Sequence, residues 1–188
     1  ALHYAARRFY APVMLSIEDK PRQQVVSVTS DLLEPWAGTV NWSLESLDGH
    51  ALDSGQSYIN AAAQANTPVC DLDFSTRVNR ENIRELVFIA ELRQGDQFVA
   101  RQAAFFTPIK HLSLSDPAIS VDLHSDGDQL VAELTSKSLA VLVELSLNNA
   151  DVVFSDNYFP LPAERTVKIT CPMPAGWTLA QAQKGIRV

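Results

Sequence analysis

Pairs of carboxylates are the side chains in this sequence that could carry acid–base chemistry. Three pairs lie close together in the chain: Asp71 with Asp73, Glu81 with Glu85, and Asp126 with Asp128. Cleavage of a glycosidic bond needs two carboxyl groups that face the sugar and differ in pKa. None of these pairs lies in an apolar or aromatic stretch that would raise one pKa by burial. We therefore expect solvated surface groups, and the sequence predicts no catalytic residue.

Histidine and cysteine residues are the next candidates, because they bind metal ions or act as nucleophiles. The histidines His3, His50, His111 and His124 are widely dispersed, and neither cysteine has a Cys or His within two to four positions. The Asp126-Gly127-Asp128 run lacks the closing bidentate acid of an EF-type calcium loop, so it indicates a hairpin turn. There is no G-x-S-x-G elbow and no glycine-rich phosphate loop. The sequence predicts no metal site and no cofactor.

Aromatic residues near turns offer a different chemistry, the stacking of sugar rings on an exposed face. Trp36, Tyr58, Tyr158 and Trp177 all lie near turn signals. The alternative is that they fill the core or an interface, since aromatic side chains contribute strongly to burial. We favour burial, and keep Trp36, Tyr58 and Trp177 as candidate sugar-stacking residues.

The run Phe154-Ser155-Asp156-Asn157-Tyr158-Phe159 places three aromatic residues around a polar group that no single regular element can bury. Asp and Asn cap their own backbone in tight turns, and aromatic rings anchor a loop. This pattern indicates a packed corner. We expect Asp156 or Asn157 to bond to local backbone, and Phe154 or Phe159 to be mostly buried.

The elements that would position these residues are mainly β-strands. Ala1 to Phe9 has helical spacing and ends before Pro12, whereas the pattern from Val13 onward alternates with a period of two and is broken by turn residues. Residues 53–55 read as a break, and residues 57–65 fit either a strand or a helix. Strands are expected over 14–18, 24–30, 39–45, 68–74, 85–93, 98–106, 119–124, 130–135, 139–147, 151–154 and 166–171.

This pattern predicts an all-β chain of two consecutive immunoglobulin-like β-sandwiches with a short N-terminal helix. The expected segments are 1–12, then a first sandwich over 13–108 and a second over 109–188, because Thr107-Pro108 breaks the strand pattern. Each unit has roughly the size of such a sandwich, about 100 residues, although the Cys-Trp-Cys hallmark is missing. Because the chain begins without Met inside a helix-like pattern, we expect it to be a piece of a longer protein.

Composition narrows the class of partner. The 188 residues are 46% hydrophobic and carry a net charge of -7 with scattered Lys and Arg, which argues against nucleic acid as a partner. No apolar run approaches the roughly 20 residues that span a bilayer, and no signal peptide is visible. We expect Cys70 and Cys171 to be free thiols, which favours a reducing, cytoplasmic location. The sequon at Asn41-Trp42-Ser43 lies in a strand pattern, so we do not expect glycosylation there.

Three stretches together resemble the C-terminal region of glycoside hydrolase family 2 β-mannosidases. They are ALHYAARRFYAPV at residues 1–13, LTSKSLA at 134–140 followed by Val143-Glu144-Leu145, and the corner at 154–159 with LPAE at 161–164. Residues 29–36, with Gly38 and Trp42, show a weaker similarity. Departures occur at Pro160 and Ala163, and affect only the shape of the loop.

The resemblance implies a large exo-acting enzyme that removes terminal β-linked mannose with retention, using two glutamates in a (β/α) barrel. Residues 1–12 would be the end of the last barrel helix, and none of the catalytic positions falls in this chain. We therefore expect non-catalytic accessory and scaffold domains, with the catalytic barrel and upstream domains as partners and mannosides as possible ligands. The alternatives are an autonomous carbohydrate-binding module and a dimerisation module. Substrate, location and oligomeric state stay open.

Overall fold

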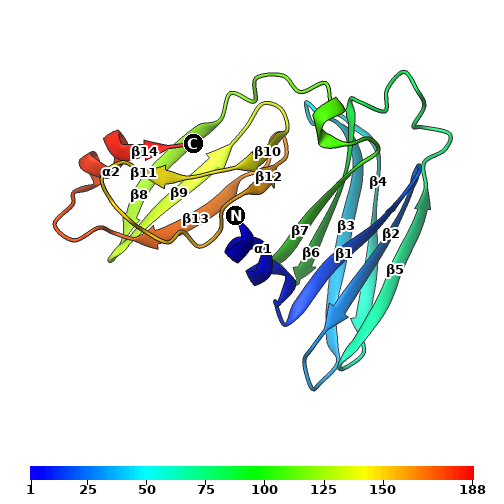
Figure 1. Cartoon of the computed structure of the whole chain (residues 1–188). Coiled ribbons are helices and arrows are strands. Elements are labelled where there is room, and N and C mark those ends of the chain that lie inside the picture. Colours follow the sequence, from blue (N-terminus) through cyan, green and yellow to red (C-terminus); the bar gives the residue numbers. More distant parts are fainter. The chain divides into compact units, whose positions relative to one another are not determined.

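The computed structural model describes the backbone of residues 1–188 and every side chain except that of Asp19. The chain folds into two compact units. We call Ala6–Ser113 the N-terminal unit, and Leu114–Val188 together with Ala1–Ala5 the C-terminal unit. Each unit is built from antiparallel strands in separate sheets (Figure 1), so the predicted all-β class is confirmed.

The N-terminal unit is a seven-stranded sandwich. A three-stranded sheet has the order β1-β2-β5 and a four-stranded sheet has the order β4-β3-β6-β7. In a constant-type immunoglobulin domain, the fourth strand, D, pairs with strand E in the ABED sheet. Here the fourth strand, β4, pairs with β3 and not with β5, so it belongs to the other sheet. The strands are β1 (Val13–Lys20), β2 (Gln23–Ser30), β3 (Trp36–Ser46), β4 (Ala51–Ala61), β5 (Ala65–Asp73), β6 (Leu86–Gln94) and β7 (Gln97–Phe105).

Period-two patterning decides which side chains enter the core of this unit. Val40 and Leu44 on β3 are fully buried, and Trp42 between them packs against the same cluster, so these alternate positions face the core. The Trp42 ring lies 6.1 Å from Phe74 and 6.3 Å from Phe88, centroid to centroid. Aromatic contacts at this range add to the stabilisation that burial itself gives.

One predicted boundary in this unit is wrong. Residues 53–55 do not break the chain, because β4 runs unbroken from Ala51 to Ala61 and pairs with β3 along its length. Gly55 lies directly opposite Trp42, and a Cβ atom at Gly55 would lie 2.5 Å from Cζ2 of that ring. The glycine is therefore required by the close approach of the indole ring, and it does not mark a turn.

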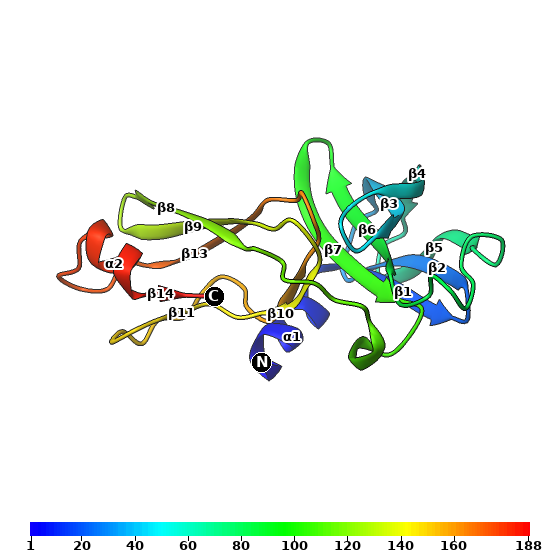
Figure 2. The ribbon, with the colours of Figure 1, turned by 90° about the horizontal axis from the view of Figure 1, so that it is seen from above.

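The C-terminal unit also has seven strands, in a three-stranded sheet β13-β9-β8 and two short pairs, β10-β12 and β11-β14. In the view from above, β8, β9 and β13 form one layer of this unit (Figure 2). Its elements are β8 (Ser120–Asp126), β9 (Gln129–Thr135), β10 (Ala140–Val143), β11 (Ser146–Leu147), β12 (Phe159–Leu161), β13 (Val167–Pro172), α2 (Leu179–Gly185) and β14 (Ile186–Arg187).

Several expectations for the C-terminal unit need correction. The strand predicted over 139–147 is divided into β10 and β11, with Leu142 at φ +54°. The strand predicted over 151–154 is irregular backbone. The helix α2 was not predicted, although Thr178 and Gln181 form a capping box that is readable from sequence. Seven residues with few apolar positions give too weak a helical period to stand out.

The border between the units lies a few residues after the predicted one. The predicted border followed Pro108, whereas the N-terminal unit extends to Ser113. Residues Ile109–His111 form a 3-10 helix, η1, and Ser113 N donates to Arg84 O at 2.8 Å. This segment is therefore bonded to the N-terminal unit and does not begin the sheet of the next one, whose first strand is β8.

The predicted N-terminal helix is present as α1 (Leu2–Phe9). It buries no residue, and Leu2 and Phe9 are 80% and 66% exposed. These two side chains are seven positions apart and therefore share one face of the helix. Among the described residues, no helix has the length and apolar character needed to cross a bilayer.

Candidate functional site

The corner at residues 154–159 is stabilised by a side chain that makes the hydrogen bonds of a paired strand residue. Asn157 is 5% exposed; its Oδ1 accepts from Leu145 N at 2.7 Å and its Nδ2 donates to Leu145 O at 2.9 Å. The amide therefore satisfies both backbone groups of Leu145, as a paired residue in a β-ladder would. These bonds join two segments 12 residues apart, whereas the expected bond to local backbone is made by Asp156, whose Oδ1 accepts from the N–H of the next residue.

Further contacts fix the same corner from both sides. Ser155 N donates to Thr170 O at 2.6 Å, and Thr170 N donates to Ser155 Oγ at 2.9 Å, which ties the corner to β13. Asp156 Oδ1 accepts from Asn157 N at 2.8 Å. Phe154 and Phe159 are 4% and 5% exposed, as expected for loop anchors. The polar atoms of this corner thus make hydrogen bonds that stabilise the fold.

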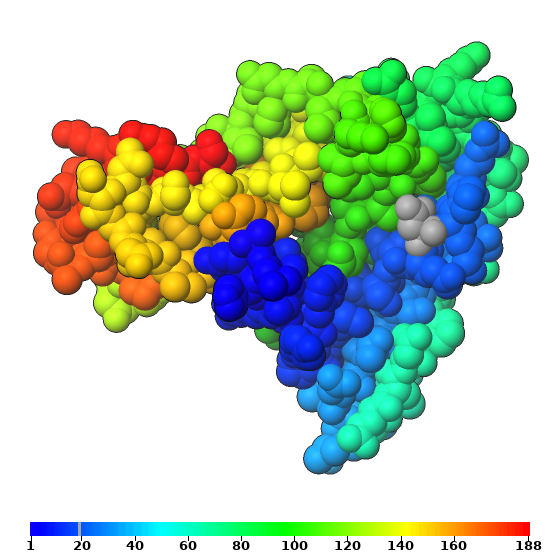
Figure 3. Space-filling view, viewed as in Figure 1, coloured from blue at the N-terminus to red at the C-terminus, as the bar shows by residue number. Residues whose placement is uncertain are grey.

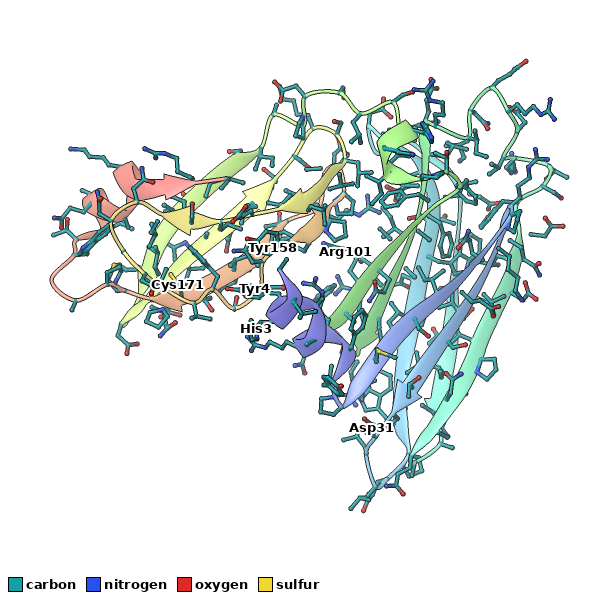
Figure 4. The ribbon with its side chains drawn as sticks, in the orientation of Figure 1. His3, Tyr4, Asp31, Arg101, Tyr158 and Cys171 are labelled. Carbon is teal, nitrogen blue, oxygen red and sulfur yellow. The ribbon has the colours of Figure 1, made fainter. Side chains whose placement is uncertain are left out.

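Tyr158 adopts a left-handed conformation, φ +57°, which is uncommon for a non-glycine residue. Its N donates to Val143 O at 2.7 Å, and its hydroxyl donates to Glu144 Oε1 at 2.6 Å. This hydroxyl bond raises the pKa of Tyr158, because it depends on the phenolic proton. The Tyr4 ring lies beside it, 6.2 Å between centroids (Figure 4).

The carboxylate pairs lie on the surface, as predicted, since all six side chains are exposed. Gln23 Nε2 donates to Asp71 Oδ1 at 2.6 Å on the neighbouring strand. The backbone N–H of Ser75 donates to Asp73 and lowers the pKa of that carboxyl, which is opposite to what a general acid needs. The other two pairs lie in the segment before β6 and at the β8–β9 turn. The structure thus gives these pairs no catalytic environment.

Metal ligands and thiols are not gathered either. Within the part of the chain that the structure describes, no three His, Cys, Asp or Glu side chains lie close enough to hold a metal ion. Cys70 and Cys171 are both free, which confirms the prediction of free thiols. Burial raises the pKa of each thiol, so the less reactive protonated form is favoured.

The three candidate stacking residues differ in exposure. Trp36 is 7% exposed and belongs to the core of the N-terminal unit, in line with the favoured burial, so it is wrong as a candidate sugar-stacking residue. Trp177 is half-buried, packs against the core of the C-terminal unit, and lies over Gly185. Tyr58 alone of the three is open to solvent, with 84% exposure.

Tyr58 lies on the outer face of the four-stranded sheet, opposite Thr39 in the register of β4 and β3. Gln56 and Asn60, two positions before and after it on β4, are exposed as well. The Gln56 amide donates to Asn41 Oδ1 on β3 at 2.8 Å. Asn41 and Gln56 were not predicted as a pair, because only the strand register brings them together.

A second surface feature is an apolar hollow of about 510 Å³ in the C-terminal unit. It is lined by β10 and the chain end, and these yellow and red segments adjoin in the space-filling view (Figure 3). Its apolar lining includes Leu114, Pro117, Ile119, Leu139, Leu142 and Val188. Among the described side chains that line it, Glu144 is the one carboxylate, so this hollow lacks the two carboxyl side chains that glycoside cleavage requires.

Comparisons with known proteins agree with this architecture. The profile of a family described as Mannosidase Ig/CBM-like domain matches residues 23–111, and that of a family described as Ig-fold domain matches residues 114–188. A sequence search of curated proteins gives no match.

Solved structures extend the comparison to the whole chain. The β-D-mannosidase from Dictyoglomus thermophilum is similar over 98% of this chain, with a TM-score of 0.85 and 17% identity. The exo-chitosanase CsxA from Amycolatopsis orientalis is similar over 97%, with a TM-score of 0.67 and 14% identity. This chain spans 22% of the length of the first protein and 25% of the second.

Proposed function

We propose that this chain is an accessory region of a glycoside hydrolase. Residues 23–111 belong to the Mannosidase Ig/CBM-like family, and residues 114–188 belong to the Ig-fold family. The chain would carry no catalytic residue, and the parent would be a β-mannosidase. The observation that carries the proposal is the structural similarity of 98% of the chain to part of a β-mannosidase, with a TM-score of 0.85. The two family matches occur in the same chain, one for each sandwich unit.

Catalysis is assigned to another part of the parent protein. The six carboxylates of the three candidate pairs are exposed, and the Asp73 pKa is lowered, so they are poorly suited to act as acid and nucleophile. The resemblance to family 2 β-mannosidases implies that a barrel domain provides two glutamates and cleaves with retention. The role left for this chain is to support that catalytic unit.

The helix α1 supports such a role. Leu2 and Phe9 share one face and are largely exposed, so the helix has apolar surface that a neighbouring domain would bury. We assign this face to contact with the catalytic barrel and upstream domains of the parent. Burial of such side chains stabilises an association by roughly 1.5–3 kcal/mol each.

The proposal is tested by assaying the complete parent protein and the isolated 188-residue chain with 4-nitrophenyl β-mannoside. We expect the complete protein to hydrolyse it with retention at the anomeric carbon, followed by NMR, and the isolated chain to give no turnover above buffer. Turnover by the isolated chain would overturn the non-catalytic role. A complete protein that cleaves β-glucosaminides and leaves β-mannosides intact would overturn the mannosidase assignment.

A further inference from the structure

Tyr58 is the centre of an open surface on the N-terminal unit. β4 is the outermost strand of its sheet (Figure 1), and Tyr58 points outward from it with 84% of its area exposed. Gln56 and Asn60 lie about 7 Å away along the strand, and Asn41 lies diagonally across on β3 at a similar distance. An aromatic ring at the edge of the sheet thus has side-chain amides on both sides along β4 and diagonally across on β3.

The positions of β3 and β4 next to Tyr58 carry no ionisable charge, although the chain as a whole has a net charge of -7. The outward positions of β4 and β3 around Tyr58 are uncharged in every case: Ala37, Thr39, Asn41, Ser54, Gln56 and Asn60. On the neighbouring strands, Glu91 and Arg101 neutralise each other in an ion pair at 2.7 Å. Arg93 donates to Asp96 O at 3.2 Å, in the β6–β7 turn. Arg93 keeps its positive charge, but it lies two strands away from Tyr58, across Thr39, so an ionic ligand would find no counter-charge on β3 and β4 themselves.

One hydrogen bond orients two of these amides relative to each other. The bond from Gln56 Nε2 to Asn41 Oδ1 leaves, among the described contacts, the Nδ2 donors of Asn41 and the Oε1 acceptor of Gln56 for a ligand. Donors and acceptors side by side match a hydroxyl group, which both donates and accepts. An aromatic ring with hydroxyl-binding groups at its margin is complementary to a sugar ring, which has an apolar C–H face and a rim of hydroxyls.

We propose that the outer face of β3 and β4 binds a neutral polysaccharide chain, with Tyr58 as the stacking platform and the Asn41–Gln56 amide pair as the hydrogen-bonding rim. The choice of a neutral glycan as occupant follows from the chemistry of this surface. The expectation that the glycan contains β-linked mannose rests on the proposed function. A single open platform gives few contacts, so we expect a dissociation constant on the order of 1 mM.

The test is a heteronuclear NMR titration of the 188-residue chain with β-1,4-mannohexaose, cellohexaose and laminarihexaose. We expect saturable shifts of the Tyr58, Asn41 and Gln56 signals with at least one of these sugars. Absence of saturable shifts with all three, up to about 10 mM, ten times the expected constant, would overturn the proposal. Binding of a glucan without mannan would support the surface and contradict the mannose expectation, whatever the parent enzyme hydrolyses.

Variants of Tyr58 distinguish the stacking of a sugar ring on this side chain from other causes of an NMR shift. Tyr58→Ala should weaken binding at least about 10-fold, while Tyr58→Phe should keep it within about 2-fold because the ring remains. Tyr10→Ala is the matched control, since Tyr10 is also 84% exposed. Equal binding by Tyr58→Ala and the unaltered chain would overturn the stacking role. Sugar-independent shifts that grow with protein concentration would instead identify a second copy of the chain as the occupant, which light scattering would show.

Discussion

The side chain of Asn157 makes the two backbone hydrogen bonds with Leu145 that a neighbouring β-strand would otherwise make. Its amide bonds to both backbone groups of Leu145 and is itself almost fully buried. A buried backbone group without a partner costs about 1–3 kcal/mol, so a side chain that satisfies two of them matters more than its size suggests. The corner is thus stabilised by polar groups that bond to backbone.

Replacing Asn157 by Ala should lower the free energy of unfolding by roughly 2–4 kcal/mol, because Leu145 N and O lose their partner together. Urea unfolding of the 188-residue chain measures this. Asp156→Ala is the matched comparison, with an expected loss of about 1 kcal/mol for its bond to Asn157 N. If Asp156→Ala proved the more damaging of the two, the structural reading of the corner would be wrong.

Tyr158 makes the corner sensitive to alkaline pH. Its pKa in the folded chain is raised by the bond to Glu144, whereas in the unfolded chain it has the usual value of about 10. The folded chain therefore holds the phenolic proton more tightly, and this contribution to stability is present below about pH 10 and is lost as the pH rises through the raised pKa.

The titration of Tyr158 can be followed by NMR with tyrosine labelled at the Cζ carbon. We expect a midpoint above 10 in the unaltered chain and a lower one in Glu144→Gln, which removes the negative charge from the acceptor. A midpoint that does not respond to Glu144→Gln would show that this bond is not the cause of the shift.

At the scale of elements, β4 shows how one close contact overrides local sequence preference. Asp53-Ser54-Gly55 has the composition of a turn, yet the strand continues because Gly55 makes room for the Trp42 ring on the paired strand. The same register places Gln56 beside Asn41 and Tyr58 beside Thr39 on the outer face. The continuity of β4 is therefore a condition for the proposed glycan surface.

Gly55→Ala tests this packing. The new Cβ would lie 2.5 Å from Trp42 Cζ2, so the ring or the strand must shift, at a cost of about 1–3 kcal/mol. Urea unfolding gives the free energy, and near-UV circular dichroism reports the Trp42 environment. Ser54→Ala, at an exposed neighbouring position, should change stability by less than about 0.5 kcal/mol. Equal effects of the two substitutions would contradict the packing argument.

At the scale of the whole molecule, the chain corresponds to about a fifth of the β-mannosidase that it resembles in fold. Its helix α1 buries no residue within the 188 residues. The proposed function assigns Leu2 and Phe9 to a contact with the catalytic part of the parent. This assignment predicts that the same substitution has different effects in the isolated chain and in the complete protein.

Phe9→Glu should lower the unfolding midpoint of the complete protein, because burying the ring would contribute about 1.5–3 kcal/mol and the new carboxylate would be desolvated. The isolated chain should change by less than about 0.5 kcal/mol, since Phe9 is 66% exposed there. Differential scanning calorimetry of both proteins makes the comparison. His3→Gln, an exposed position off the Leu2–Phe9 face, is the control. Equal shifts in the two proteins would remove α1 from the proposed contact.

The local sequence pattern was sufficient to predict part of the fold and part of the candidate site. The period of two along residues 13–172 indicated two antiparallel sandwiches, since alternation itself places every second side chain in a core. The helix α1, the buried rings of Phe154 and Phe159, the bond of Asp156 to local backbone and the two free thiols also followed from residue type and immediate neighbours.

Tertiary structure decided what depends on partners far away in the sequence. Trp36 and Tyr58 both lie near turns, so the sequence does not distinguish them. The packing of the strands buries Trp36 in the core and leaves Tyr58 exposed to solvent. Tertiary structure extended β4 through Gly55 and joined residues 109–113 to Arg84, since each contact spans more than ten positions. It also paired Asn41 with Gln56, 15 positions apart. Strand register, which no local window contains, therefore created the surface around Tyr58 on which the further proposal depends.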